Sequence, residues 1–213
     1  VKLTLQRMKM EYEEVEPEKK RHYDSYLDSV LEEVLRLRNV ADNFLKFFRA
    51  DHPDYKNVNI CDLISSLVGK YRSVLPEQVE LCFNNHTEDC VIEADPNQIE
   101  ILLSNIIDNS IHAIEKKGSI EIRLNVLDKF ESEGIRSYAV IDIEDSGRGL
   151  DQPELEKVFE PYISGDSDGT GLGLSIVRKI AESHQGTVRI TSKKNIGTLV
   201  TIELPVKHRK TEK

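Results

Sequence analysis

Apolar residues recur at helical spacings through the first fifty residues of the chain. A first stripe consists of Val1, Leu5, Met8, Tyr12 and Val15. A second stripe consists of Val30, Val34, Leu37, Ala41, Phe44 and Phe48. Steps of three and four residues place each set on one face of a helix, so residues 1–50 are predicted to form an antiparallel helical hairpin. One hairpin cannot bury so wide an apolar face, and we therefore expect a four-helix dimerisation bundle in a homodimer.

The pattern changes at Pro53, which ends the second helix because proline lacks a backbone N–H and restricts the residue before it. We predict a linker over residues 51–60, a mixed domain over residues 61–206 and a disordered basic tail over residues 207–213. The order of helical and strand-like runs predicts an α+β fold, a two-layer α/β sandwich in which helices cover one sheet. The expected strands are Val79–Phe83, Val91–Ala94, Ser119–Leu127, Ser137–Glu144, Thr187–Thr191 and Thr198–Leu204, and the expected helices are Cys61–Leu75, Pro96–Lys116 and Leu174–Ser183.

Composition excludes several functions. The 213 residues carry a formal net charge of −9, so the mean field of the protein repels nucleic acid and anionic lipid. No apolar run approaches the roughly 20 residues of a membrane helix, and no signal-peptide pattern is present. We therefore expect a cytoplasmic protein that reaches a membrane, such as the inner membrane, only through segments outside this sequence. The first residue is Val1 rather than Met, which suggests a fragment.

The helix that begins at Pro96 carries a polar stripe on an otherwise apolar surface. Asp95 can cap its start, and Gly118 is expected to close it. Asn105, Asn109 and His112 stand at i, i+4 and i+7, which puts two amides and an imidazole on one face. Polar groups on a mostly buried helix need partners, which are either a bound ligand or neighbouring loops.

Two glycine-containing segments follow this helix. Asp145 comes directly after a strand and is followed by Gly147 and Gly149. A carboxylate there can accept a hydrogen bond from an amino group, and glycines let a flat ring approach the backbone, although an ordinary turn has the same composition. The segment Gly169-Thr170-Gly171-Leu172-Gly173 leads directly into a helix. Free N–H groups at a helix start bind anions, and phosphate is the usual occupant.

The combination of these motifs is far more specific than any one of them. In chain order they are Asn105-x3-Asn109 on a helix, Asp145-x-Gly147-x-Gly149 after a strand, the segment Val158–Tyr162, and the glycine triplet before a helix. The stretch Asp95–Leu204 resembles the ATP-binding domain of sensor histidine kinases, whose fold is shared with gyrase, Hsp90 and MutL ATPases. The short lid and the linker are most similar to those of NtrY-type and NtrB-type kinases.

The resemblance implies a role for each motif residue in binding ATP or ADP. Asn109 becomes a ligand of the Mg²⁺ that bridges the phosphates, and Asn105 has the catalytic role of supporting metal or phosphates from one turn earlier. Asp145 accepts from the adenine amino group, helped by Thr198. Gly147 and Gly149 admit the adenine ring, and the later glycines end a mobile lid over the phosphates. The other implied nucleotide-binding residues are His112, Lys116, Tyr162, Gly169, Thr170, Gly171, Leu172 and Gly173.

The activity implied is that of a protein-histidine kinase. It phosphorylates its own histidine from ATP and relays the phosphoryl group to an aspartate of a response regulator, and it can also act as the phosphatase of that regulator. The acceptor string of the family is missing here, and His22 matches it only in residue type. Val1–Leu5 resembles the stretch just after that string, so the acceptor is expected upstream of Val1. His112 stands where the family commonly has Lys or Arg, which predicts modest autokinase activity.

Two other functions stay open. An ATP hydrolase of the gyrase or Hsp90 kind needs a glutamate where Asn105 stands, because an amide cannot accept a proton from water. Asn105 therefore argues against hydrolysis. The alternative is a non-catalytic nucleotide-binding protein, either a scaffold or an anti-sigma-type protein of the same fold. The helical hairpin predicted before Pro53 argues against the anti-sigma form, whereas a scaffold remains open as long as no acceptor histidine is identified.

Overall fold

The computed structural model describes residues 17–87, 90–132, 134–161 and 171–206, and the chain divides into two units, Val1–Leu45 and Lys46–Lys213. Helix α2 begins at Pro17 in the first unit and ends at Arg49 in the second. The second apolar stripe lies on this helix, where Leu37 and Phe44 expose 62% and 49% of their surface. The first predicted helix lies outside the described residues, so the hairpin and its four-helix bundle remain predictions.

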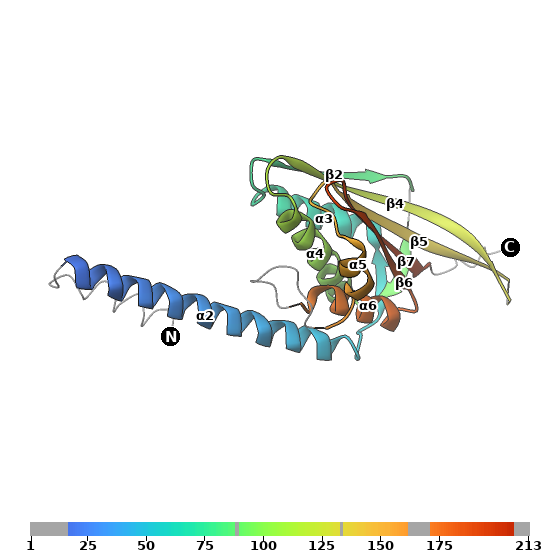
Figure 1. The fold of residues 1–213 in the computed structure, drawn as a ribbon. Helices are drawn as coiled ribbons and strands as arrows, with labels where there is room; N and C mark the ends of the chain where they lie inside the picture. Colours follow the sequence, from blue (N-terminus) through green and yellow to red (C-terminus); the bar gives the residue numbers. More distant parts are fainter. Residues whose placement is uncertain (1–16, 88–89, 133, 162–170, 207–213) are drawn as a thin grey trace. The chain divides into compact units, whose positions relative to one another are not determined.

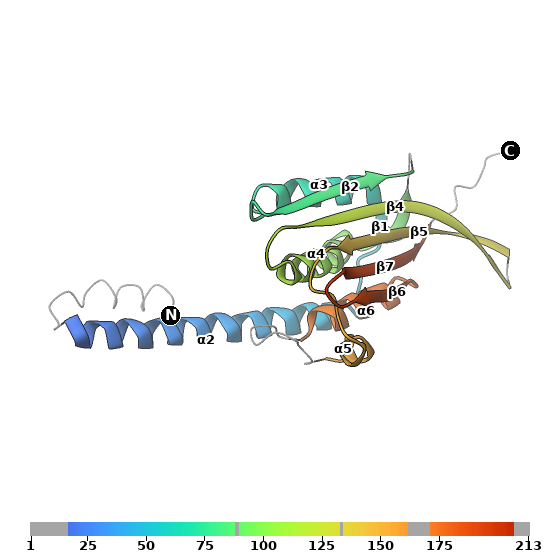
Figure 2. The ribbon, with the colours of Figure 1, turned by 45° about the horizontal axis from the view of Figure 1, so that its top comes forward.

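The second unit is a two-layer sandwich, which confirms the predicted fold class. Its five-stranded sheet has the order β2-β4-β5-β7-β6, with β2 parallel to β4 and the other neighbours antiparallel. Helices α3, α4 and α6 form the second layer (Figures 1 and 2). The elements are β1 (Lys56–Asn59), α3 (Ile60–Arg72), β2 (Val79–Asn85), β3 (Val91–Ala94), α4 (Pro96–Ala113), β4 (Gly118–Glu131), β5 (Gly134–Asp145), α5 (Gln152–Lys157), α6 (Gly173–Ser183), β6 (Thr187–Lys193) and β7 (Gly197–Pro205).

The hydrophobic core lies between this sheet and its helices. Alternate residues of each strand point toward the helices, and Ile122 and Ile141 are examples that are almost completely buried. The apolar face of α4 meets them with fully or almost fully buried side chains, namely Ile99, Leu102, Leu103, Ile106 and Ile107. Each large aliphatic side chain contributes about 1.5–3 kcal/mol when it is buried. Packing therefore holds α4, with its polar stripe, firmly against the sheet.

The start of α4 agrees with the prediction, but its end does not. The Asp95 side chain accepts hydrogen bonds from the backbone N–H groups of Asn97 and Gln98, at 2.9 and 3.3 Å. The helix ends at Ala113, and Gly118 begins β4 instead of closing the helix. The reason is that β4 pairs with β2 in a parallel ladder from its first residue. This long-range pairing is invisible to helical periodicity.

The segment predicted as a linker over residues 51–60 contains regular structure. Its last part forms β1, which pairs antiparallel with β3, and α3 follows at once. Four residues are too few for periodicity to reveal, and their partner strand lies far along the chain. The short helix α5 was also missed, although its capping box of Asp151 and Glu154 is a recognisable start signal.

The β4–β5 hairpin extends beyond the strands on either side of it (Figure 1). β4 pairs with β2 only as far as Leu124, and β5 pairs with β7 only from Tyr138 onward. β4 and β5 pair with each other beyond these residues, as far as Glu131 and Gly134. The sequence pattern therefore underestimated both strands. Most residues in the outer part of both strands are exposed, so the alternation of apolar and polar residues that a buried face requires is lost there.

A buried histidine lies at the end of α6. His184 is 3% exposed, its Nε2 accepts a hydrogen bond from the Asp95 backbone N–H at 3.0 Å, and its Nδ1 lies 2.8 Å from the Ile180 carbonyl oxygen. Burial lowers the pKa of His184 from its usual 6.5, and this outweighs the Ile180 carbonyl and the Asp95 carboxylate, which favour the cation. His184 is therefore neutral in the folded protein, with Nδ1 as donor and Nε2 as acceptor.

We expect the protein to lose stability as the pH falls below about 6.5. In that range the unfolded chain protonates His184, whereas the folded protein keeps it neutral down to a lower pH. The unfolded state then binds more protons, so the free energy of unfolding decreases with falling pH. Urea unfolding at about pH 7 and about pH 5.5 measures this difference.

The matched control is His184→Gln. Glutamine keeps an acceptor for the Asp95 amide but does not titrate, so the stability of this variant should depend less on pH over the same range. An equal pH dependence in the two proteins would contradict the prediction.

Candidate functional site

Asp145, the last residue of β5, lies at one end of the candidate site. It is 7% exposed, and its Oδ1 accepts a hydrogen bond from the Gly147 backbone N–H at 2.8 Å. Its Oδ2 accepts one from the Ser110 hydroxyl of α4 at 3.2 Å. Burial raises the pKa of Asp145 above 3.8, and hydrogen bonds from Gly147, Ser110 and the Thr198 backbone oppose this rise. Each carboxylate oxygen has two acceptor sites, so the buried group can still accept from a ligand.

The turn after Asp145 packs closely against the end of α4. A Cβ atom at Gly147 would lie 2.7 Å from the carbonyl oxygen of Ala113. The Arg148 backbone N–H donates to the same carbonyl at 2.9 Å. Gly149 has φ +60°, and a Cβ atom there would collide with the Lys193 carbonyl. These two glycines therefore have a packing role in this turn, in addition to the predicted access for an adenine ring.

The other end of the site lies where α4 faces the start of α6. Asn105 Nδ2 donates to the Ile101 carbonyl at 2.7 Å, which leaves the Asn105 amide oxygen for other contacts. A Cβ atom at Gly173 would lie 3.2 Å from Asn105 Oδ1 and 3.8 Å from Asn109 Oδ1. The fold thus brings both asparagines next to Gly173, and a side chain at that position would fill the space between them and the helix start.

The start of α6 presents backbone N–H groups. Its N-cap residue, Leu172, is buried and makes no side-chain capping hydrogen bond, and the first turn contains no acidic residue. Such a helix start, with its dipole, favours an anion. Gly171 has φ +65°, a left-handed conformation that glycine adopts without strain. Tyr162, Gly169 and Thr170 lie outside the described residues, so their predicted contacts remain predictions.

Thr198 and Ser110 complete the surroundings of Asp145. Thr198 pairs with Asp145 in the β5–β7 ladder, and its hydroxyl lies 2.9 Å from the Ser192 hydroxyl. Ser110 was missed from the sequence, although a polar residue on the buried side of α4, next to Asn109, was an available signal. Its hydroxyl connects the helix that carries the two asparagines to the carboxylate.

His112 and Lys116 are both exposed. His112 lies in the last turn of α4, and Lys116 lies beyond its end, in the connection to β4. These positions do not test the predicted contacts of the two side chains with phosphates, which remain a prediction.

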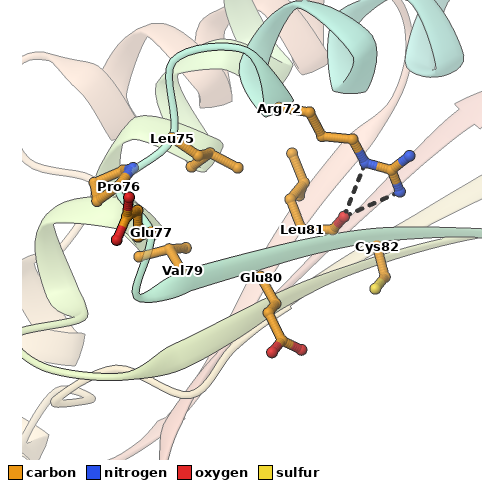
Figure 3. Close-up of a pocket in the computed structure, with 8 residues that line it drawn as sticks. All are labelled: Arg72, Leu75, Pro76, Glu77, Val79, Glu80, Leu81 and Cys82. Carbon is orange, nitrogen blue, oxygen red and sulfur yellow. Dashed lines mark hydrogen bonds between the residues drawn. The ribbon is translucent and has the colours of Figure 1, made fainter.

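A hollow of about 450 Å³ lies elsewhere, beside the edge strand β2 (Figure 3). Arg72 Nε and Nη2 donate to the Leu81 carbonyl at 3.3 and 3.2 Å. None of the candidate site residues lines this hollow, and the Arg72 contact caps an acceptor on the unpaired edge of the sheet. The lining residues are Arg72, Leu75, Pro76, Glu77, Val79, Glu80, Leu81 and Cys82.

The sandwich, the amide-bearing helix and the buried carboxylate together define a class of nucleotide-binding domain. Residues 94–208 match the family described as histidine kinase-, DNA gyrase B-, and HSP90-like ATPase. This match covers more than half of the chain, and the chain belongs to that family. The resemblance drawn from the sequence motifs is confirmed.

Within this family the chain is similar to sensor kinases. It is 33% identical over 175 residues to the sensor histidine kinase ZraS of Klebsiella oxytoca, covering 82% of this chain and 36% of ZraS. It is also 33% identical over 171 residues to the sensory histidine kinase/phosphatase NtrB of the same organism, covering 78% of this chain and 48% of NtrB. The chain thus spans between about a third and a half of these relatives.

A solved structure shares the fold over most of the chain. The histidine kinase ThkA, in complex with the response regulator protein TrrA, superposes with a TM-score of 0.69 and 24% sequence identity. The match covers 94% of this chain and 55% of ThkA. In the part of our chain that the structure describes, none of the helices combines the length and apolar character needed to cross a membrane.

Proposed function

We propose that the chain is the dimerising and ATP-binding part of a sensor histidine kinase of a two-component system. The observation that carries this proposal is the placement of Asn105 and Asn109 against the start of α6, with Asp145 fixed to the same helix by Ser110. An adenine amino group can donate to Asp145, while the phosphates lie between the two amides and the N–H groups at Gly173.

Phosphoryl transfer to a histidine suits this site better than hydrolysis does. Hydrolysis needs a base that accepts a proton from water, and the Asn105 amide cannot do so. A kinase site instead works by positioning the phosphates and balancing their charge. The similarity to ZraS and NtrB supports this assignment. A non-catalytic scaffold that binds nucleotide is the alternative.

The two asparagines also suit a magnesium ion. Mg²⁺ prefers oxygen ligands and is commonly held by one or two protein groups together with substrate phosphates. The Asn109 side chain is exposed beside Gly173, so its Oδ1 can serve as such a ligand. Among the described residues, no group of three or more His, Cys, Asp or Glu side chains could hold a metal by itself. A bound Mg²⁺ would neutralise charge on the phosphates.

The proposed partners are a second copy of the chain and the receiver domain of a response regulator. The exposed stripe on α2 supports the first, and the crystal structure of ThkA with TrrA supports the second. We place the chain in the cytoplasm, where such regulators act, and its parent protein can be anchored in a membrane through other segments.

The test of this function uses the full-length product of the gene. Incubation with Mg²⁺ and γ-labelled ATP should give a protein-bound label that acid removes and base does not, as expected for phosphohistidine. Asn105→Ala should reduce the labelling rate by about tenfold or more, because phosphate positioning is lost. Asn97→Ala, an exposed position in the first turn of the same helix, is the matched control and should label normally.

The absence of acid-labile label in a protein that binds ATP would favour the scaffold. Equal labelling of the Asn105→Ala variant and the parent would instead show that Asn105 does not position the phosphates.

A further inference from the structure

Helices α4 and α6 lie antiparallel and contact each other near both ends. At one end the Asp95 backbone N–H, just before α4, donates to His184 at the end of α6 at 3.0 Å. At the other end Gly173, the first residue of α6, lies beside Asn105 and Asn109. The two contacts are separated by about ten residues on each helix, which is roughly 15 Å. The phosphate end of the site and the His184 end are therefore two ends of one helix pair.

His184 fixes this pair through both ring nitrogens. Its Nδ1 is held by the Ile180 carbonyl at 2.8 Å and lies 3.2 Å from the Ser183 hydroxyl, so the ring cannot turn without losing these contacts. Its Nε2 is then directed at the Asp95 amide. Because the side chain is almost completely buried, water cannot readily replace either bond. Sliding of α6 along α4 must break the Nε2 contact.

The segment Asp51–Tyr55, which directly precedes β1, contacts the helix pair at its His184 end. The Asp54 backbone N–H donates to Asp95 Oδ2 at 3.0 Å. The Tyr55 hydroxyl donates to the Ser183 carbonyl at 2.5 Å, and its ring contacts the His184 ring edge-on with 5.3 Å between centroids. Asp51 forms an ion pair with Lys179 of α6 at 2.8 Å. The segment thus touches the end of one helix and the start of the other.

We propose that His184 is a positioning residue for the nucleotide site, because it fixes the register of α6 against α4 and joins both helices to the segment Asp51–Tyr55. Packed helices are stiff, so a shift at the His184 end moves Gly173 relative to Asn105 and Asn109. Asp145 belongs to β5 and is held by Ser110, so the adenine end stays in place. The inference rests on the proposed nucleotide site. It predicts that changes at the segment Asp51–Tyr55 alter phosphate binding at that site and leave adenine binding unaltered.

The experiment compares His184→Leu and His184→Gln with the parent chain. Leucine removes the acceptor for the Asp95 amide, whereas glutamine supplies one at the position of Nε2. His184→Leu should weaken Mg-ATP binding by about tenfold, as expected for coupling between two sites, and leave adenosine binding within about twofold. His184→Gln should restore most of the Mg-ATP affinity. Titration calorimetry with Mg-ATP and with adenosine measures both.

Arg72→Leu is the matched control, because it also removes hydrogen bonds to a backbone group of this unit but lies at the β2 edge. Its affinities for both ligands should equal those of the parent. Unchanged Mg-ATP affinity in His184→Leu, or an equal loss for Mg-ATP and adenosine, would overturn the inference. If the parent binds neither ligand, it is the proposed nucleotide site that fails.

A measurement on the unmodified chain covers the case in which His184→Leu does not fold. Mg-ATP should slow amide hydrogen exchange at the non-proline residues of 51–55 and at Asp95 by about threefold or more, because it stabilises the helix pair that holds them. Adenosine should leave those amides unchanged. Equal protection by both ligands, or by neither, would overturn the inference.

Discussion

Replacement of Asp145 by asparagine is expected to abolish most of the affinity for adenine nucleotides. The carboxylate already accepts from Gly147 and from Ser110, and adenine brings a further donor. An asparagine has a single oxygen, and its NH₂ group would face one of these donors. A hydrogen bond to a charged group contributes about 1.5–3 kcal/mol, so ATP affinity should fall by roughly 10- to 150-fold. Titration calorimetry with ATP and with adenosine should show similar losses.

Asp142→Asn is the matched control for this variant. Asp142 lies on the same strand, on the opposite face of the sheet, and accepts a hydrogen bond from the Thr201 hydroxyl at 2.6 Å. Its replacement should leave nucleotide affinity unchanged. Unaltered ATP affinity in Asp145→Asn would remove the adenine assignment.

Asn109→Ala should give the complementary result. Adenosine affinity should stay close to that of the parent, because Asp145 is untouched, whereas the dependence of ATP binding on Mg²⁺ should disappear. A variant that responds to Mg²⁺ as the parent does would show that Asn109 is not a metal ligand.

The second large effect is expected in the oligomeric state. The apolar stripe of α2 includes Leu37 and Phe44, which expose 62% and 49% of their surface. If this stripe forms the seam of a dimer, the double change Leu37→Glu and Phe44→Glu buries two carboxylates without partners. The variant should then be a monomer. Light scattering should give the mass of one chain, 24.3 kDa, for the variant and twice that for the parent.

The control places the same two charges elsewhere on the helix. Ser25→Glu and Leu35→Glu alter exposed positions that helical periodicity puts outside the stripe. This protein should remain dimeric, and circular dichroism should show that both variants keep their helix content. A parent chain that stays monomeric at all accessible concentrations would remove the dimer proposal.

Several parts of this protein could be predicted from the sequence because they depend on interactions between residues that are close together in the chain. The start of α4 is an example, since Asp95 caps the next turn and needs nothing from elsewhere. Asn105 and Asn109 share a face because a helix repeats every 3.6 residues. The glycines before α6 likewise indicate an anion site from local backbone chemistry. Such features permitted the resemblance to the ATP-binding domain to be drawn.

Other parts depended on pairings between distant residues. β1 is a strand only because β3 lies beside it, and α4 ends at Ala113 because β4, which begins at Gly118, pairs with β2. Ser110 of α4 contacts Asp145 of β5, although the whole of β4 lies between them in the sequence. No spacing along the chain encodes these contacts.

The residue types and their spacing already define the chemical groups that this protein can offer, which are two amides on one helix, a carboxylate at a strand end and a glycine-rich helix start. Their arrangement comes from the packed fold, which places Gly173 against Asn105 and His184 against Asp95. Periodicity and capping act over one or two helical turns, whereas the burial of α4 and α6 against a common sheet sets the distances between groups far apart in the chain.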